Sequence, residues 1–145
     1  MKMKNRQRYL VAVHVFLIKN GRILLSRRQN TGFEDGKFSV PSGHLEKGET
    51  VIETAKREAK EEVGINLKNK DIKFAGVMHR KSNDERIDFF FKVSKWQKKL
   101  FNAEPEKCSE LLWVSPKNLP KDTVPYIREA IKNYLQKLPF SCFGF

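Results

Sequence analysis

Cysteine is scarce in this sequence, with only Cys108 and Cys142 among 145 residues. Two cysteines are too few for a disulfide framework, and their spacing is not that of a metal site. We therefore expect a reducing, cytoplasmic compartment and two unreactive thiols. Basic residues precede an apolar run near the N-terminus, but His14 interrupts that run and no small-residue cleavage site follows it, which favours a strand over a signal peptide.

Long apolar runs are also missing, since no stretch approaches the roughly 20 residues needed to cross a bilayer. This predicts a soluble protein. Acidic residues are few, with 17 Asp and Glu against 29 Lys and Arg, so the net charge is +12. Such an excess favours polyanionic partners such as nucleotides, RNA or an acidic membrane surface, although an ordinary solvated surface has the same composition. We expect a small-molecule nucleotide as the substrate, RNA as an alternative partner and no membrane partner, in a chain that is either a monomer or a homodimer.

What is present fits one packed domain spanning residues 1–145. The chain is 39% hydrophobic with 11 Phe, and a domain of this length buries roughly two-thirds of its unfolded surface. Apolar patterns predict strands at residues 9–18, 22–25, 72–78, 87–93 and 111–114. The Asn20-Gly21 dipeptide predicts a tight hairpin turn, and the glycine-rich segment 29–48 predicts a structured loop. After Pro125, helical spacing continues as far as Leu138.

A helix is predicted over residues 50–63. Thr50 and Glu53 have the spacing of a capping box, and Gly64 suits a left-handed C-cap. Small and apolar residues recur on one side of this helix and predict close packing on the sheet, namely Val51, Ala55, Ala59 and Val63.

Three glutamates, Glu58, Glu61 and Glu62, lie three and four residues apart on the other side of the same helix. Their carboxylates can therefore converge on one volume. A like-charge pair four residues apart costs a few tenths of a kcal/mol in an isolated helix, which a bound cation would offset. Carboxylate oxygens suit Mg²⁺, or alternatively Mn²⁺, better than zinc. Glutamate pairs on helices are more often plain solvated surface, and the loop before the helix decides against that interpretation.

The segment from the loop to the C-cap closely resembles the Nudix box of the Nudix hydrolases. Its seven fixed residues occur at the required spacing within 23 positions, namely Gly43, Glu49, Arg57, Glu58, Glu61, Glu62 and Gly64. Two departures are mild: Ala59 where the family often has a larger aliphatic residue, and Ser42 where a second glycine is common. Neither departure removes a metal ligand.

The resemblance implies an α/β fold, the Nudix α/β/α sandwich with a mixed β-sheet. It also implies that Glu58, Glu61 and Glu62 bind Mg²⁺ together with the backbone carbonyl of Gly43, and that Arg57 and Glu49 brace the loop against the helix. In such a site a bound water attacks phosphorus in line. The general base would be Glu61 or Glu62, or else a carboxylate from a later loop, for which the candidates are Glu104, Glu106 and Glu110.

Substrate contacts are less well defined by the sequence. Phosphate could be bound by Arg27 and Arg28 after the second strand, or by His79 and Arg80 after a later one, because guanidinium groups match phosphate oxygens. For each of these residues, an ordinary surface charge is the alternative interpretation.

His14, inside an apolar strand, is expected to be structural. The C-terminal residues 140–145 are apolar enough to dock on the domain or to meet a partner or a membrane surface. Several aromatic residues could stack a base or fill the core: Phe33, Phe89, Phe90, Phe91, Trp96 and Trp113.

The leading functional prediction is a MutT-like nucleoside triphosphate pyrophosphohydrolase. ADP-ribose, dinucleoside polyphosphates, sugar nucleotides and capped RNA remain alternative substrates, because specificity lies outside the box. A non-catalytic nucleotide- or RNA-binding Nudix module is the alternative from another functional class.

Overall fold

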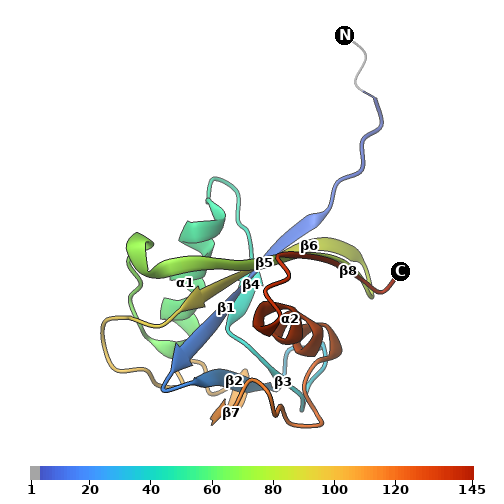
Figure 1. Cartoon of the computed structure of the whole chain (residues 1–145). Helices are drawn as coiled ribbons and strands as arrows, with labels where there is room; N and C mark the ends of the chain where they lie inside the picture. The colour runs from blue at the N-terminus through green and yellow to red at the C-terminus, as the bar shows by residue number, and fades with distance from the viewer. Residues whose placement is uncertain (1–3) are drawn as a thin grey trace.

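The computed structural model describes residues 4–145, so the first three residues of the predicted domain lie outside it. The described chain forms eight strands, two α-helices and one 3₁₀ turn (Figure 1). In chain order these are β1 (Leu10–Lys19), β2 (Arg22–Arg28), β3 (Phe38–Ser39), β4 (Ser42–His44), α1 (Val51–Val63), the 3₁₀ turn (Asn69–Asp71), β5 (Ile72–Lys81), β6 (Glu85–Val93), β7 (Cys108–Val114), α2 (Pro125–Leu135) and β8 (Phe140–Phe143).

The strands form one mixed sheet in the order β3-β2-β1-β6-β5-β8, with β4 also paired to β1 and β7 to β2. Strand β1 runs parallel to β6, and β5 runs parallel to β8, whereas the other pairs are antiparallel. The predicted mixed sheet is therefore confirmed. The pairing of β1 with β4 places Gly43 opposite Val13, which fixes the glycine-rich loop on the sheet.

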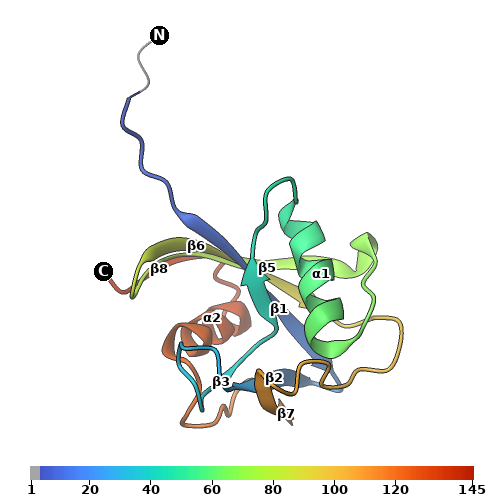
Figure 2. The same ribbon diagram turned by 180° about the vertical axis from the view of Figure 1, so that it is seen from behind.

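The two helices cover opposite faces of the sheet (Figures 1 and 2). On β1, Val13 and Val15 belong to the core that packs under α1, whereas Phe16 belongs to the core under α2. Alternate side chains of a strand point to opposite faces, which explains why this strand is apolar on both sides. The predicted α/β/α sandwich is confirmed.

Local sequence signals account for the two best-predicted features. Asn20 and Gly21 both have positive φ, 53° and 73°, as a tight hairpin turn between antiparallel strands requires. At the start of α1, the Thr50 hydroxyl accepts from the Glu53 amide at 3.1 Å, and the Glu53 carboxylate accepts from the Thr50 amide at 3.2 Å. At its end Gly64 is left-handed and its amide donates to the Lys60 carbonyl at 3.1 Å.

Several predicted boundaries were wrong. The strand predicted at 22–25 continues to Arg28, so Arg27 and Arg28 lie within β2 and not after it, and the strand predicted at 111–114 begins at Cys108. The loop at residues 29–48 contains the short strands β3 and β4. The segment 79–86, predicted as a connection, instead continues β5 to Lys81 and begins β6 at Glu85, because partner residues pair across a tight reversal. Helix α2 stops at Leu135, since Lys137 adopts a φ of 57° and turns the chain away from the helix axis.

The C-terminal segment, which the sequence left undecided, adds β8 to the edge of the sheet beside β5. Phe143 packs against the core under α2, whereas Phe140 and Phe145 are 63% and 70% exposed. The segment therefore docks on its own domain and still leaves aromatic surface in solvent. Neither helix in residues 4–145 has the length and apolar character that a membrane crossing requires.

Candidate active site

A cavity of about 710 Å³ lies between α1, the β4 loop and the turn that joins β5 to β6. Gly43 and the three glutamates predicted as metal ligands, Glu58, Glu61 and Glu62, all line it. The capped helix directs this face toward the cavity while Ala55 and Ala59 are buried on the other side. The structure thus brings the four predicted ligand residues to one cavity.

The three carboxylates differ in environment. Glu62 Oε2 accepts from the Ser42 amide at 2.8 Å, and burial together with the charge of Glu58 raises the pKa of Glu62 well above its usual range. Burial also raises the pKa of Glu58, although its Oε1 accepts from Arg57 Nη1 at 2.6 Å. The Glu61 side chain is 51% exposed and lies 3.4 Å from the same guanidinium nitrogen. For Glu58 and Glu62, the hydrogen bonds and nearby positive charge therefore do not offset the cost of burying a charged carboxylate.

Arg57 joins the loop to the helix. Its Nε and Nη2 donate to the two carboxylate oxygens of Glu49 at 2.7 and 3.0 Å, and Nη2 also donates to the His44 carbonyl at 3.0 Å. The hydrogen bond from Arg57 lowers the pKa of Glu49 to about 2. The Glu49 carboxylate also accepts from the Glu46 amide and the Thr54 hydroxyl. This bidentate pair is the brace that the sequence resemblance implied.

The predicted phosphate-binding residues divide into two pairs, and one member of each lines the cavity. Arg28 and Arg80 line it, whereas Arg27 and His79 are absent from its lining. Adjacent residues of a strand point to opposite faces, so β2 and β5 can each present one of the two. Arg27 instead forms two ion pairs, from Nε to Glu110 Oε1 at 2.9 Å and from Nη1 to Asp122 Oδ2 at 3.2 Å. His79 lies 3.1 Å from Glu85 Oε2.

Arg28 and Arg80 both have protein partners. Arg28 donates from Nε to the Phe33 carbonyl at 2.7 Å and from Nη2 to the Thr31 hydroxyl at 3.0 Å, so it orders the loop at the mouth of the cavity. Arg80 is 2% exposed and donates from Nε to Asp88 Oδ2 at 2.7 Å. Arg80 is thus a buried ion-pair partner as well as a cavity wall, which its sequence position did not reveal.

The inner wall of the cavity is built from a buried polar network. His14 Nε2 lies 3.0 Å from Asp88 Oδ1, and the Arg80 guanidinium lies 3.7 Å from the centre of the Tyr126 ring. His14 also stacks on Phe90, with ring centres 4.7 Å apart. Within the described residues His14 Nδ1 has no hydrogen-bond partner. His14 is buried as expected, but it also lines the cavity, so the prediction that left it out of the site was wrong. Sequence reasoning missed its partner because Asp88 lies 74 positions away.

Residues 8–134 match the family described as the NUDIX domain. This chain belongs to the Nudix family. The match includes every residue that lines the cavity, and it confirms the family resemblance drawn from the box.

Named relatives agree with this assignment. The Nudix chain is 34% identical over 129 residues to an ADP-ribose pyrophosphatase of Methanocaldococcus jannaschii, covering 87% of this chain and 73% of that protein. It is 26% identical over 128 residues to the 8-oxo-dGTP diphosphatase of Escherichia coli, covering 88% and 96%. A crystal structure of a MutT Nudix hydrolase from Burkholderia pseudomallei superposes with a TM-score of 0.78 at 22% identity, covering 87% and 98%. The predicted enzyme class, a Nudix pyrophosphohydrolase, is confirmed.

Nudix enzymes generally use divalent metal ions, and the donor chemistry of this cavity fits one. Glu58, Glu61, Glu62 and the Gly43 carbonyl offer oxygen atoms only, as hard cations prefer. A Cβ built at Gly43 would overlap the Glu58 carboxylate, so the close approach of backbone and carboxylate depends on glycine. In residues 4–145 no three acidic, histidine or cysteine side chains are grouped closely enough to hold an ion as they stand. Two oxygens that would bind an ion already accept hydrogen bonds, Glu58 Oε1 from Arg57 and Glu62 Oε2 from the Ser42 amide.

Of the later-loop carboxylates, Glu104 is the one that lines the cavity of the Nudix chain. Its charge contributes to the raised pKa of both Glu58 and Glu62, which places it electrostatically close to them. Glu106 and Glu110 are absent from the lining, and Glu110 is paired with Arg27. The candidates for a general base that share the cavity are therefore Glu61, Glu62 and Glu104.

Sequence reasoning did not single out two further groups at the cavity mouth. Arg86 donates from Nη1 to His44 Nε2 at 2.9 Å and from Nη2 to Asp84 Oδ2 at 2.7 Å. Burial and the charge of Arg86 lower the pKa of His44. Both residues lie in segments that the sequence predicts to be loops. The one sequence feature that could have pointed to a site residue is that His44 directly follows Gly43, the first glycine of the box.

Proposed function

We propose that this Nudix chain is a magnesium-dependent, MutT-like pyrophosphohydrolase that cleaves a phosphoanhydride bond of a nucleoside triphosphate. The observation that carries the proposal is that one cavity contains both the three box glutamates with Gly43 and an inner wall made of a buried polar network. Its volume is within the range of roughly 300–1,000 Å³ that holds small ligands. One end is rich in carboxylates and suits a metal-bound phosphate chain.

The inner end supports a nucleotide over a bare polyphosphate. Arg80 is neutralised by Asp88, so this wall has little net charge. Tyr126 and His14 contribute aromatic surface, and Val40 and Ala12 contribute apolar surface to the same lining. A planar base with hydrogen-bonding edges suits such a wall better than a second phosphate group does.

In this proposal Glu58, Glu61, Glu62 and the Gly43 carbonyl hold Mg²⁺, or Mn²⁺ in its place. Such an ion, when bound, neutralises phosphate charge and lowers the pKa of water. Water attacks phosphorus in line, the anhydride P–O bond breaks, and its electron pair leaves with the departing phosphate. Glu61 is the preferred acceptor of the water proton because its side chain is half exposed and its contact with Arg57 is long. Glu104 is the alternative base.

The chain's own residues hold these groups in place. Arg57 and Glu49 fix the β4 loop against α1, and the loop ordered by Arg28 borders the cavity mouth. Fixed positions matter because a displacement of about 1 Å can cost on the order of 100-fold in rate.

ADP-ribose is the second candidate substrate. It is favoured by the 34% identity to the archaeal ADP-ribose pyrophosphatase, and it has the same adjacent phosphates and base. Capped RNA, dinucleoside polyphosphates and sugar nucleotides remain further alternatives that contain the same bond.

The test is a nucleotide panel with wild type and Glu61→Gln, run with magnesium, with manganese and with chelator. The matched control is Glu106→Gln, which removes a carboxylate outside the cavity. We expect metal-dependent triphosphate turnover that falls at least about 100-fold in Glu61→Gln and is retained in the control. Turnover of ADP-ribose but of no triphosphate would favour the second candidate. Nucleotide binding without any turnover would instead support the non-catalytic binding module.

A further inference from the structure

We infer that the end of the sheet opposite the cavity binds single-stranded nucleic acid. This surface, here called the basic end, lies where β1 and β6 finish and β5 begins. The segments 19–22, 66–75 and 92–100 supply a single acidic residue, Asp71. They supply nine basic residues: Lys19, Arg22, Lys68, Lys70, Lys73, Lys92, Lys95, Lys98 and Lys99. None of the nine lines the catalytic cavity, so the inference does not depend on which nucleotide is hydrolysed.

Strand register brings these separate segments together. Val93 lies opposite Leu17 on β1 and opposite Ile72 on β5, so the ends of all three strands meet. The chain before β5 and the chain after β6 are joined by two backbone hydrogen bonds between Asn66 and Gln97, at 3.0 and 3.1 Å. The lysines of both segments therefore crowd one end of the sheet.

Two like-charge pairs face each other directly across strands at this end. Lys19 is the cross-strand partner of Arg22, and Lys73 is the partner of Lys92. Like charges placed opposite each other destabilise a sheet. Within residues 4–145 none of the nine basic side chains forms a salt bridge. The described residues therefore leave this cluster of positive charge without ion-pair partners, which suits an anionic ligand.

An aromatic pair adjoins these charges. The rings of Trp96 and Trp113 stack almost parallel, at 12°, with centres 6.3 Å apart, and Lys19 Nζ lies 6.0 Å from the centre of the Trp96 ring. Trp96 also lines a hollow of about 220 Å³ in which three lysines, Lys68, Lys70 and Lys95, outnumber one acidic residue, Asp71. A half-buried indole beside lysines is how proteins stack an unpaired base while binding its phosphates. This combination favours a single strand over a membrane surface.

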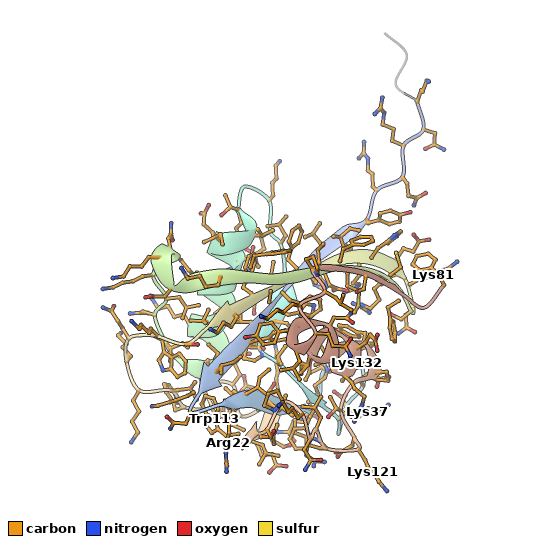
Figure 3. All side chains as sticks on the ribbon, viewed as in Figure 1. Arg22, Lys37, Lys81, Trp113, Lys121 and Lys132 are labelled. Atoms are coloured by element: carbon orange, nitrogen blue, oxygen red, sulfur yellow. The ribbon has the colours of Figure 1, made fainter. Side chains whose placement is uncertain are left out.

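Figure 3 labels Arg22 on β2 and Trp113 on the paired strand β7, and both lie apart from Lys81, Lys121 and Lys132. Those distant lysines provide a matched control. The basic-end variant combines Lys19→Gln, Lys73→Gln and Lys95→Gln. The control variant combines Lys81→Gln, Lys121→Gln and Lys132→Gln. All six side chains are exposed, and both variants lose the same charge.

The experiment measures fluorescence anisotropy of labelled oligouridine of about 20 nucleotides, titrated with each protein at several salt concentrations. For the basic-end variant we expect Kd to rise at least about tenfold. The slope of log K against log salt should shrink by about 2, since each lost single-strand phosphate contact contributes about 0.7. The control variant should stay within about twofold of wild type. Hydrolysis of small nucleotides should be unchanged in both.

Trp96→Leu provides a second test, because stacking contributes without charge. It should weaken oligouridine binding while leaving the salt slope unchanged, with thermal unfolding used to verify that the variant is folded. Equal weakening by both lysine variants would show that total charge alone is sensed and would overturn the proposal. Binding to phosphatidylserine vesicles that is lost in the basic-end variant, with no binding to oligouridine, would overturn it in favour of a membrane surface.

Discussion

Replacing Asp88 by Asn should strongly destabilise the fold. The Asp88 side chain is fully buried, and it accepts from Arg80, whose side chain is 3% exposed, and pairs with His14. Asn keeps the shape but removes the charge, so the Arg80 guanidinium is left buried without a counter-ion. Breaking one partner of a buried ion pair costs about 3–5 kcal/mol. At roughly 2–4 °C per kcal/mol for a chain of this size, Tm should fall by about 6–20 °C.

The measurement is thermal unfolding followed by circular dichroism, with Arg80→Met and the double variant completing a cycle. Because Arg80→Met removes the orphaned charge, the double variant should be more stable than Asp88→Asn alone. The reasoning is refuted if Asp88→Asn melts within about 2 °C of wild type, or if the two substitutions simply add.

The same ion pair predicts a pH dependence. Burial opposes ionisation of Asp88, but the hydrogen bonds and charges of His14 and Arg80 outweigh it and lower its pKa below the usual value. A carboxylate with a lowered folded-state pKa contributes stability above its unfolded pKa, and that contribution is lost as pH falls through the folded value. Wild type should therefore lose stability below about pH 4, and Asp88→Asn should lose less over that interval.

The remaining predictions concern the loop and the cap of the box. Gly43→Ala would force Glu58 from its position against the backbone, and we expect kcat to fall by about 100-fold with little change in Tm. Gly64→Ala places a Cβ at a φ of 69° and against the Phe101 ring, so chemical denaturation should show a loss of about 1–2 kcal/mol or more. Glu49→Gln weakens the bidentate brace, and steady-state kinetics should show a lower kcat, whereas an unchanged kcat would deny the brace a positioning role.

Features governed by neighbours in sequence were predictable. The capping box at Thr50, the left-handed Gly64 and the Asn20-Gly21 turn each depend on a few adjacent residues, and all three are present. The placement of Glu58, Glu61 and Glu62 on one helical face follows from helix geometry alone. The sequence by itself therefore determined helix α1, its cap and the face that carries the carboxylates, and with them the family.

Only the tertiary structure decided which other residues reach the cavity. The alternation of a strand allows one of Arg27 and Arg28, and one of His79 and Arg80, to face it, and the periodicity alone does not say which. The partnership of Asp88 with His14 depends on pairing between strands 74 positions apart. The gathering of lysines at the basic end and the docking of β8 likewise depend on register. Such contacts depend on how the whole sheet assembles, because no short segment contains both partners.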